Sequence, residues 1–459
     1  MKQTGEEWVR QEFGGVELGD ERLCKRLISL ASKLAQNPEL SLPGSLLDKA
    51  ALKGAYRFFD NDDIQAQQLL GQHLRQTQAR AQAHSTVLAI QDTSALDYHT
   101  HRATKGLGPI SDGGWGLLMH NVLMVSPERL PLGVIFQRAW ARDPEQEGLK
   151  HPRRERSIQD KESVKWLQGL EATNEFARDG DTRVVCVADR EADVYDLFAA
   201  ERAANVELLI RAAWNRRVDA PQEHLWPTVA ASVALGQAMV TLPRRGTQAA
   251  RSCTLDLHAC EVTLRPPKWR QAERLAPVKI HAVWAVERHP PPKTEAVQWM
   301  LLSTLAITTL EQALECLDWY CARWTIEVWH KVLKSGCRIE SLQLGSAERL
   351  TRALAVYSVL AWRLLYATML SRTAPDIPAS VLLEPEEWQA LYCAVHQTPT
   401  PCATPPTLRQ AVHWIAKLGG FIGRKSDGEP GLQTLWQGLQ ALSQLTKMFL
   451  IMRPPPPGS

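Results

Sequence analysis

The sequence lacks the features of a membrane-bound or secreted protein. Its longest apolar run, residues 353–362, is shorter than the roughly 20 apolar residues that span a bilayer. The first eight residues include Glu6 and Glu7 and no apolar run, so we expect no signal peptide and a cytoplasmic location. Nine cysteines are dispersed without a CxxC pair, which fits a reducing compartment and argues against a structural zinc site.

The chain also lacks a strong net charge. Its 459 residues include 53 Lys and Arg against 50 Asp and Glu, so bulk charge does not indicate a nucleic-acid partner. Apolar residues make up 44%, which is typical of a folded protein and excludes a disordered chain. Locally, residues 211–300 contain thirteen Lys and Arg against seven Asp and Glu, whereas residues 1–65 contain nine against eleven. Any nucleic acid must therefore be bound through local surfaces.

The first 70 residues have helical periodicity. A helix is expected from about Ser45 to Asp60, and it carries Lys49, Lys53 and Arg57 four residues apart on one stripe. The stripe is either the solvated face of a small bundle or a surface that lies against DNA. The spacing alone leaves both interpretations open.

The middle of the chain alternates strand and helix patterns, which predicts a mixed α/β sheet. The predicted strands are 86–90, 115–125, 132–139, 183–188, 206–211 and 299–305, and the predicted helices are 157–176 and 191–203. Residues 215–300 contain Pro, Gly and short β-like runs, and we interpret them as an inserted β subdomain. A long helix is expected at about 309–335, and the pattern from 340 onward is helical.

Two aspartates stand out because each follows a short buried strand. Asp92 follows the run at 86–90 after one residue, Gln91, and Asp189 directly follows the run at 183–188. A turn or capping role explains either residue alone, but two strands of one sheet could bring both to the same edge. Carboxylates that close would repel each other, and a divalent cation would neutralise them.

The helix expected at 309–335 has a narrow polar stripe on a mostly apolar surface. At 100° per residue, Arg323, Glu327, His330 and Lys334 fall within an arc of about 100°. This is either an amphipathic surface helix with an Arg–Glu pair or a buried helix with one functional face. The stripe has no short solvating residues, which favours a site that holds metal and phosphate.

The stripe has a recognisable spacing. Tyr320-x2-Arg323-x3-Glu327-x6-Lys334 resembles the YREK signature of the insertion-sequence-four (IS-four) family of bacterial DDE transposases, and in particular its Tn-five-type cut-and-paste members. Other matching segments are GAYRFF at 54–59, QDTSAL at 91–96, DKESVKWL at 160–167, ADREADV at 188–194, RWTIEVWHK at 323–331 and KLGGF at 417–421. The resemblance extends from about residue 7 to residue 448.

The resemblance implies an α/β fold with three domains. An N-terminal helical DNA-binding domain, 1–70, would precede an RNase-H-like catalytic domain, 71–370, with its β insertion at about 215–300. A C-terminal helical dimerisation domain, 371–459, would end in a frayed Pro-rich tail.

It also implies the chemistry of the site. Asp92, Asp189 and Glu327 match the DDE triad, which would hold two Mg²⁺ ions roughly 3.5–4 Å apart, with Mn²⁺ expected to substitute. Strand nicking, hairpin formation, hairpin opening and strand transfer would share this site, because each is an in-line phosphoryl displacement. Two alternatives remain, namely a catalytically silent DNA-binding regulator of the parent element and another RNase-H-like nuclease.

The implied partners are double-stranded DNA, as transposon ends and as target, and a second copy of the chain in a paired-end complex, with no membrane. Tyr320, Arg323 and Lys334 match residues that hold phosphates around a flipped-out base, and Trp299 and Trp324 match the aromatic pair that accommodates that base. Further DNA contacts are expected from Arg211 and, in the N-terminal domain, from Lys53 and Arg57.

Overall fold

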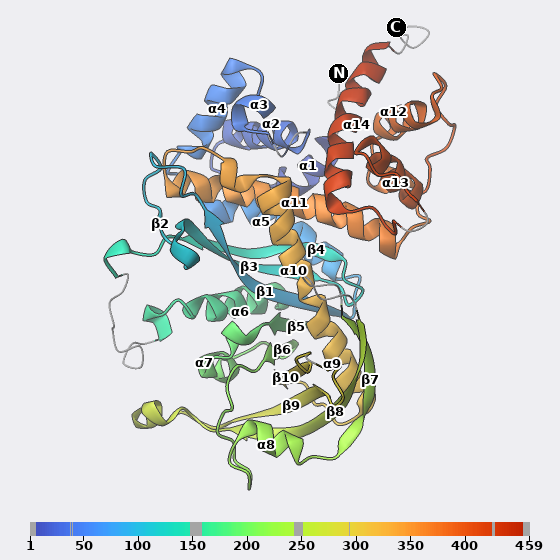
Figure 1. Ribbon diagram of the computed structural model, residues 1–459. Coiled ribbons are helices and arrows are strands. Elements are labelled where there is room, and N and C mark those ends of the chain that lie inside the picture. The colour runs from blue at the N-terminus through green and yellow to red at the C-terminus, as the bar shows by residue number, and fades with distance from the viewer. Residues whose placement is uncertain are drawn as a thin grey trace.

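The computed structural model describes residues 6–36, 38, 40–146, 158–242, 251–292, 294–424 and 427–452. The Pro-rich tail that was predicted to fray lies outside the described residues. A twisted sheet crosses the middle of the molecule, and helices from both ends of the chain lie together above it in Figure 1. The predicted mixed α/β organisation is therefore confirmed.

The N-terminal region is helical, as predicted. Its helices are α1 (Glu6–Phe13), α2 (Glu21–Gln36), α3 (Leu42–Ser45), α4 (Lys49–Phe59) and α5 (Ala66–Ala81). Helix α4 begins at Lys49 rather than at Ser45, because the Asp48 carboxylate accepts hydrogen bonds from the N–H groups of Ala50 and Ala51 and caps the helix there.

One ten-stranded sheet forms the centre, in the order β2-β3-β1-β5-β6-β10-β9-β8-β7, with β4 paired to β3. Strands β1, β5 and β6 are parallel neighbours, and the other pairs are antiparallel. The strands are β1 (Thr86–Asp97), β2 (Gly108–Pro109), β3 (Trp115–Val125), β4 (Pro131–Trp140), β5 (Arg183–Ala188), β6 (Val206–Arg211), β7 (Ala234–Leu242), β8 (Arg251–Leu264), β9 (Val278–Glu287) and β10 (Gln298–Ser303).

The β segment predicted at 215–300 extends this sheet. Strand β10 pairs antiparallel with β6, with Leu302 opposite Ile210, and β9, β8 and β7 follow outward from it. Hydrogen bonding therefore runs without interruption from the parallel centre into the β segment, which we had expected as a subdomain of its own. The short helix α8 (Leu225–Ala230) packs against β8 and β9.

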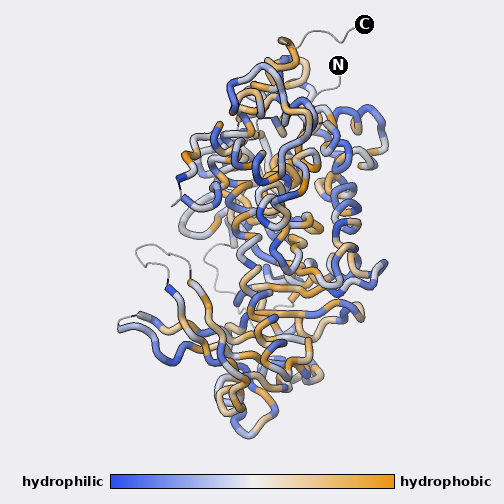
Figure 2. The backbone as a smooth tube through the Cα atoms, turned by 90° about the vertical axis from the view of Figure 1, so that its right-hand side faces the viewer, coloured by the Kyte–Doolittle hydropathy of each residue, from blue (hydrophilic) through white to orange (hydrophobic). Residues whose placement is uncertain are grey.

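Helices cover both faces of the parallel centre. Leu88 and Ile90 of β1 belong to the apolar cluster that includes α10 (Trp324–Lys331) and α11 (Ala347–Thr373). Val87 and Ala89 point the other way, into the cluster with α6 (Val164–Ala177) and α7 (Tyr195–Ala199). Because both faces are buried, the central strands are continuously apolar, and Figure 2 shows them mainly in orange.

The helix expected at 309–335 is divided into segments. Helix α9 (Leu310–Ala322) ends at Arg323, α10 follows, and a wider π-helical turn spans Val332–Gly336. The helix predicted at 191–203 is also shorter, because it consists of a 3₁₀ turn, Arg190–Ala192, and the single-turn helix α7.

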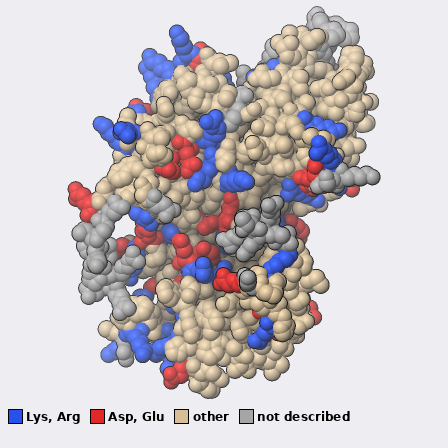
Figure 3. Space-filling model, viewed as in Figure 1, with Lys and Arg blue, Asp and Glu red and all other residues tan. Residues whose placement is uncertain are grey.

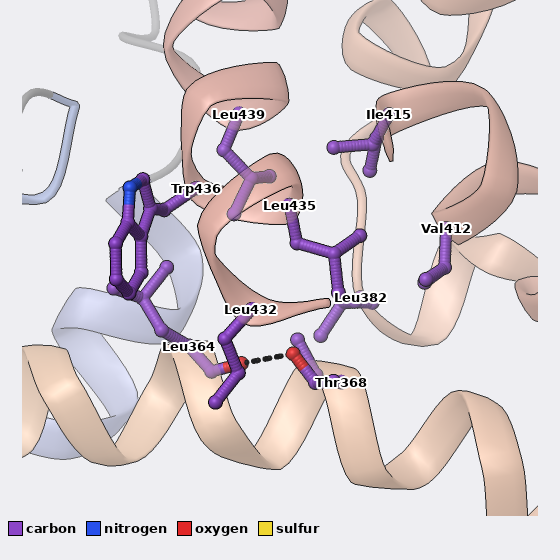
Figure 4. Close-up of a pocket in the computed structure, with 10 residues that line it drawn as sticks. Leu364, Thr368, Leu382, Val412, Ile415, Leu432, Leu435, Trp436 and Leu439 are labelled. Atoms are coloured by element: carbon purple, nitrogen blue, oxygen red, sulfur yellow. Dashed lines mark hydrogen bonds between the residues drawn. The ribbon is translucent and has the colours of Figure 1, made fainter. Parts of the chain in front are cut away.

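The C-terminal region is helical, as predicted, and contains α11, α12 (Pro385–His396), α13 (Leu408–Leu418) and α14 (Leu432–Met452). By length and composition α11 could cross a membrane, but 72% of its apolar window is buried inside the protein, as in a core helix. Helices α11, α13 and α14 enclose a small apolar pocket (Figure 4). Its walls include Leu364, Thr368, Val412, Ile415, Leu435, Trp436 and Leu439.

Candidate active site

Asp92 lies inside strand β1, which corrects our expectation that it follows the strand. Strand β1 is paired in parallel with β5 only as far as Ile90, opposite Val187, but it remains paired with β3 through Asp97. Asp92 therefore stands where β1 has passed the end of its pairing with β5, opposite Asn121 of β3. The sequence pattern predicted that the strand ends before Asp92, because the apolar run stops at Ile90, but pairing with β3 continues the strand to Asp97.

Asp189 directly follows β5, as predicted, and it also has a capping role. Its Oδ1 accepts a hydrogen bond of 2.9 Å from the N–H of Glu191 in the following 3₁₀ turn. Its charge nevertheless acts on Asp92, because the negative charges of Asp189 and Glu327 both contribute to raising the pKa of Asp92. Three carboxylates from β1, the end of β5 and α10 are therefore close enough to interact electrostatically.

The pKa of Asp92 is raised from 3.8 to about 7. Burial is the main cause, and Asp189 and Glu327 add to it, whereas a hydrogen bond from the Thr93 N–H and the charge of Arg323 act in the opposite direction. The raised pKa shows that the positive charge nearby does not fully neutralise these buried carboxylates. Strongly shifted pKa values of this kind are common in active sites.

Arg323 carries a positive charge beside two of these carboxylates, Asp92 and Glu327. Its Nη2 donates to Glu327 Oε1 at 2.5 Å, and its Nη1 is 3.8 Å from Asp92 Oδ2. The guanidinium carbon is also 5.6 Å from the centre of the Trp324 ring. The Arg–Glu pair expected from the spacing is therefore present, but it lies beside Asp92 and not on an open helix surface.

Aromatic side chains lie next to Arg323. Trp299 of β10 is half-buried, with its ring centre 6.0 Å from that of Tyr320, whereas Trp324 is 54% exposed. Arg211, at the end of β6, donates to the carbonyl oxygen of Gln298, the residue that precedes Trp299. The structure thus places Arg211 and Tyr320 beside Trp299.

Lys334 is fixed near the same strand as Asp92. Its Nζ donates to the carbonyl oxygen of Ala95 at 2.7 Å and lies 3.2 Å from Glu340 Oε1. Glu340 also accepts a hydrogen bond from the Asp97 N–H. Sequence reasoning missed Glu340, since it lies beyond Gly336, where the helix ends and helical spacing no longer applies.

The remaining predicted residues form a separate surface. Lys53 and Arg57 are exposed on α4 together with Lys49, while Phe58 and Phe59 of the same helix are buried. Figure 3 shows Lys and Arg side chains gathered at the upper left, over α4 and its neighbours. This face lies in the N-terminal helical region, away from the carboxylates at the sheet.

Two buried polar residues lie next to Asp92, namely His330, which belongs to the predicted polar stripe, and Asn121, which was not selected from the sequence. His330 Nδ1 is 3.9 Å from Asp92 Oδ2, and its Nε2 bonds Asn121 Oδ1 at 3.3 Å. Burial lowers the pKa of His330 to about 3, assisted by the charge of Lys334, so the ring is neutral. The sequence signal for Asn121 was the polar pair His120–Asn121 within the apolar run 115–125.

The donor set fits a hard divalent cation, because carboxylate oxygens are the ligands that Mg²⁺ prefers and their charge is only partly neutralised here. The described residues contain no group of three carboxylate, His or Cys side chains already close enough to hold a metal ion. The hydrogen bond from Arg323 to Glu327 is one reason, since it holds the Glu327 carboxylate that a metal ion would need.

Two family models match the chain. A "Transposase DNA-binding" model matches residues 5–64, and a "Transposase Tn5 dimerisation domain" model matches residues 359–449. The first covers α1 to α4 with the exposed basic face, and the second covers the C-terminal part of α11 through most of α14. Together the matches support a Tn5-like transposase.

Proposed function

We propose that this chain is a cut-and-paste DDE transposase of the IS-four type, acting in the cytoplasm on the ends of its own element. The observation that carries the proposal is that Asp189, at the end of β5, and Glu327, on α10, both act electrostatically on the buried Asp92 of β1. The two family matches support it independently, because they flank the segment that contains these residues. The central sheet would then be an RNase-H-like core, extended by β7 to β10.

Asp92, Asp189 and Glu327 would hold Mg²⁺, or Mn²⁺ in its place. When bound, the ions would activate the attacking oxygen and stabilise the leaving oxygen of each phosphoryl displacement. Arg323 and Lys334 would exchange their present partners, Glu327 and Glu340, for phosphates of the DNA. Such an exchange is favourable, because guanidinium and ammonium groups bind phosphate strongly.

The remaining predicted contacts have separate roles in the proposal. Trp299 and Trp324 would receive an unstacked base next to Tyr320. The face with Lys53 and Arg57 would bind the double-stranded transposon end, with Arg211 contacting the same DNA nearer to the cut. The matched dimerisation segment, 359–449, would join two copies into a homodimer that pairs two ends.

The test uses a linear DNA that carries the inverted repeats flanking the gene. The full chain should cut it with Mg²⁺ and not with EDTA, and Asp189→Ala should bind the ends but leave them uncut. Normal cleavage by Asp189→Ala would overturn the proposed site. Specific binding without any cleavage by the wild-type chain would instead favour a regulator.

A further inference from the structure

A buried chain of polar groups connects the candidate active site to helix α11. Ser358 Oγ of α11 donates to Gln137 Oε1 of β4 at 2.5 Å, and Asn121 Nδ2 of β3 donates to the same oxygen at 3.3 Å. Asn121 Oδ1 is then bonded to His330 Nε2 at 3.3 Å. The chain ends at the imidazole beside Asp92.

This order of donors defines the protonation of the ring. Because the amide nitrogen of Asn121 is directed at Gln137, its oxygen faces His330 and can only accept. The proton of the neutral imidazole therefore resides on Nε2, and Nδ1 carries a lone pair. That lone pair faces Asp92 Oδ2 across 3.9 Å, a gap too long for a direct bond. Once Asp92 has given up its proton, which metal binding requires, two acceptors face each other across this gap.

Two acceptors in a buried position require a donor or a cation between them. Histidines in metal sites commonly have this arrangement, in which one ring nitrogen is anchored by an outer hydrogen bond and the other is turned to the ion. We propose that His330 is a fourth residue of the divalent-metal site, with its unprotonated Nδ1 turned toward the hydration shell of the ion. This rests on the proposed function, since it needs a metal at the three carboxylates.

The test compares two substitutions that each keep one end of the imidazole. In His330→Asn the amide oxygen lies near the position of Nδ1, whereas in His330→Gln the amide lies near Nε2 and retains the bond to Asn121. Mn²⁺ affinity is measured on the full chain by electron paramagnetic resonance. We expect His330→Gln to bind Mn²⁺ about 10-fold more weakly, and His330→Asn to stay within about threefold of wild type.

Nuclear magnetic resonance of ¹⁵N-histidine-labelled protein supplies a readout that does not depend on catalysis. We expect the Nε2–H form for His330 and a change of its Nδ1 resonance when Mg²⁺ is added. An Nδ1–H form, or equal Mn²⁺ affinity of wild type and His330→Gln while Asp189→Ala is weakened, would overturn the role of His330 alone. Absence of Mn²⁺ binding by the wild-type chain would overturn the metal site and the proposed function with it.

Discussion

The Arg323 guanidinium bonds Glu327 one helical turn further along the chain, and the same group lies 3.8 Å from Asp92. It thus partly neutralises two carboxylates that come from a helix and from a strand. Any cation that binds these carboxylates must compete with the guanidinium for Glu327 and tolerate its charge near Asp92. Arg323, which is expected to hold DNA phosphate, therefore also opposes cation binding at these carboxylates in the absence of DNA.

Replacing Arg323 by Gln should strengthen metal binding in the absence of DNA. Removal of the positive charge releases Glu327 and lowers the repulsion of a divalent cation, and we expect Mn²⁺ affinity to rise about tenfold, or 1.4 kcal/mol. Arg323→Lys, which keeps the charge, should remain close to wild type. Weaker Mn²⁺ binding by Arg323→Gln would show that the guanidinium positions Glu327 more than it competes with metal.

The raised pKa of Asp92 makes stability depend on pH. The ordinary pKa of an aspartate is 3.8, whereas that of Asp92 in the folded protein is about 7, so the bound proton favours folding at low pH. That contribution is complete below about pH 4 and is lost as the pH rises through 7. In EDTA at pH 8, Asp92→Asn should therefore increase the free energy of unfolding by up to roughly 4 kcal/mol. The increase is measured as a higher melting temperature than that of the wild type.

Asp97 on the same strand is the matched control. Some burial acts to raise its pKa, but hydrogen bonds with His99 lower it overall. Asp97→Asn should therefore not stabilise the protein at pH 8. If both variants change the melting temperature alike, the effect of Asp92→Asn does not come from its protonation.

Helix α11 holds the N-terminal unit through Arg352. Its guanidinium donates to the carbonyl oxygens of Phe59 and Ile64 and to Asp62, and it is buried. Arg352→Met would leave two buried carbonyls without a partner, and we expect a loss of about 2–4 kcal/mol in unfolding free energy. Urea unfolding of the full chain measures it.

Arg349, one turn earlier on α11, provides the comparison. It pairs with Asp60, but both side chains are substantially exposed. Exposed ion pairs contribute roughly 0–1 kcal/mol, so Arg349→Met should change stability much less than Arg352→Met. Equal losses would mean that the exposed pair and the buried bonds contribute similarly.

Local periodicity predicted the strands of the parallel centre and most of the helices, because β1, β5 and β6 are buried on both faces and form apolar runs. It did not predict β2 or β9. It could not predict that β10 pairs with β6, since strand partners are chosen by contacts between residues far apart in the chain. The π-helical turn at 332–336 escaped prediction because its sequence continues the helical pattern.

The part of the candidate site that lies within one helix could be predicted from residue spacing. Arg323 and Glu327 were paired by spacing, and the structure has that pair. Asn121 and Glu340 could not be assigned in the same way, because their roles depend on tertiary contacts with His330 and Lys334. Single polar residues in apolar strands were the only sequence signal for such contacts.

The end of α14 presents exposed apolar side chains, where we expect a second copy to bind. Met448, Ile451 and Met452 are exposed, and Met448 lies in the segment matched by the dimerisation model. Changing Met448 and Ile451 to Glu should prevent the paired-end complex and leave single-end binding intact, because charges replace apolar contacts. Native gels with two labelled ends distinguish the two species.

Met239 on β7 is equally suited as a control, since it is exposed and lies in another part of the protein. Met239→Glu should leave paired-end complexes at the wild-type level. Paired complexes formed normally by the Met448→Glu, Ile451→Glu double variant would place the dimer contact elsewhere in the C-terminal region.

The position of Trp299 separates two steps of the proposed reaction. Its half-buried ring lies 6.0 Å from that of Tyr320 and can provide a platform for one unstacked base. Stacking on an aromatic side chain is worth about 1–3 kcal/mol per base. A hairpin requires the second strand to bend sharply into the site, which is easier when a base has left the stack, whereas the first nick has no such requirement.

Trp299→Ala should therefore leave nicking near the wild-type rate and slow hairpin formation about 10-fold, if about 1.4 kcal/mol of stabilisation is lost. An abasic nucleotide at the flipped position should partly restore the rate, because less stacking must then be broken. Trp214→Ala, at an exposed tryptophan in the loop after β6, is the control and should affect neither step. A time course on one labelled end resolves nicked and hairpin products, and equal slowing of both without abasic rescue would assign Trp299 to packing.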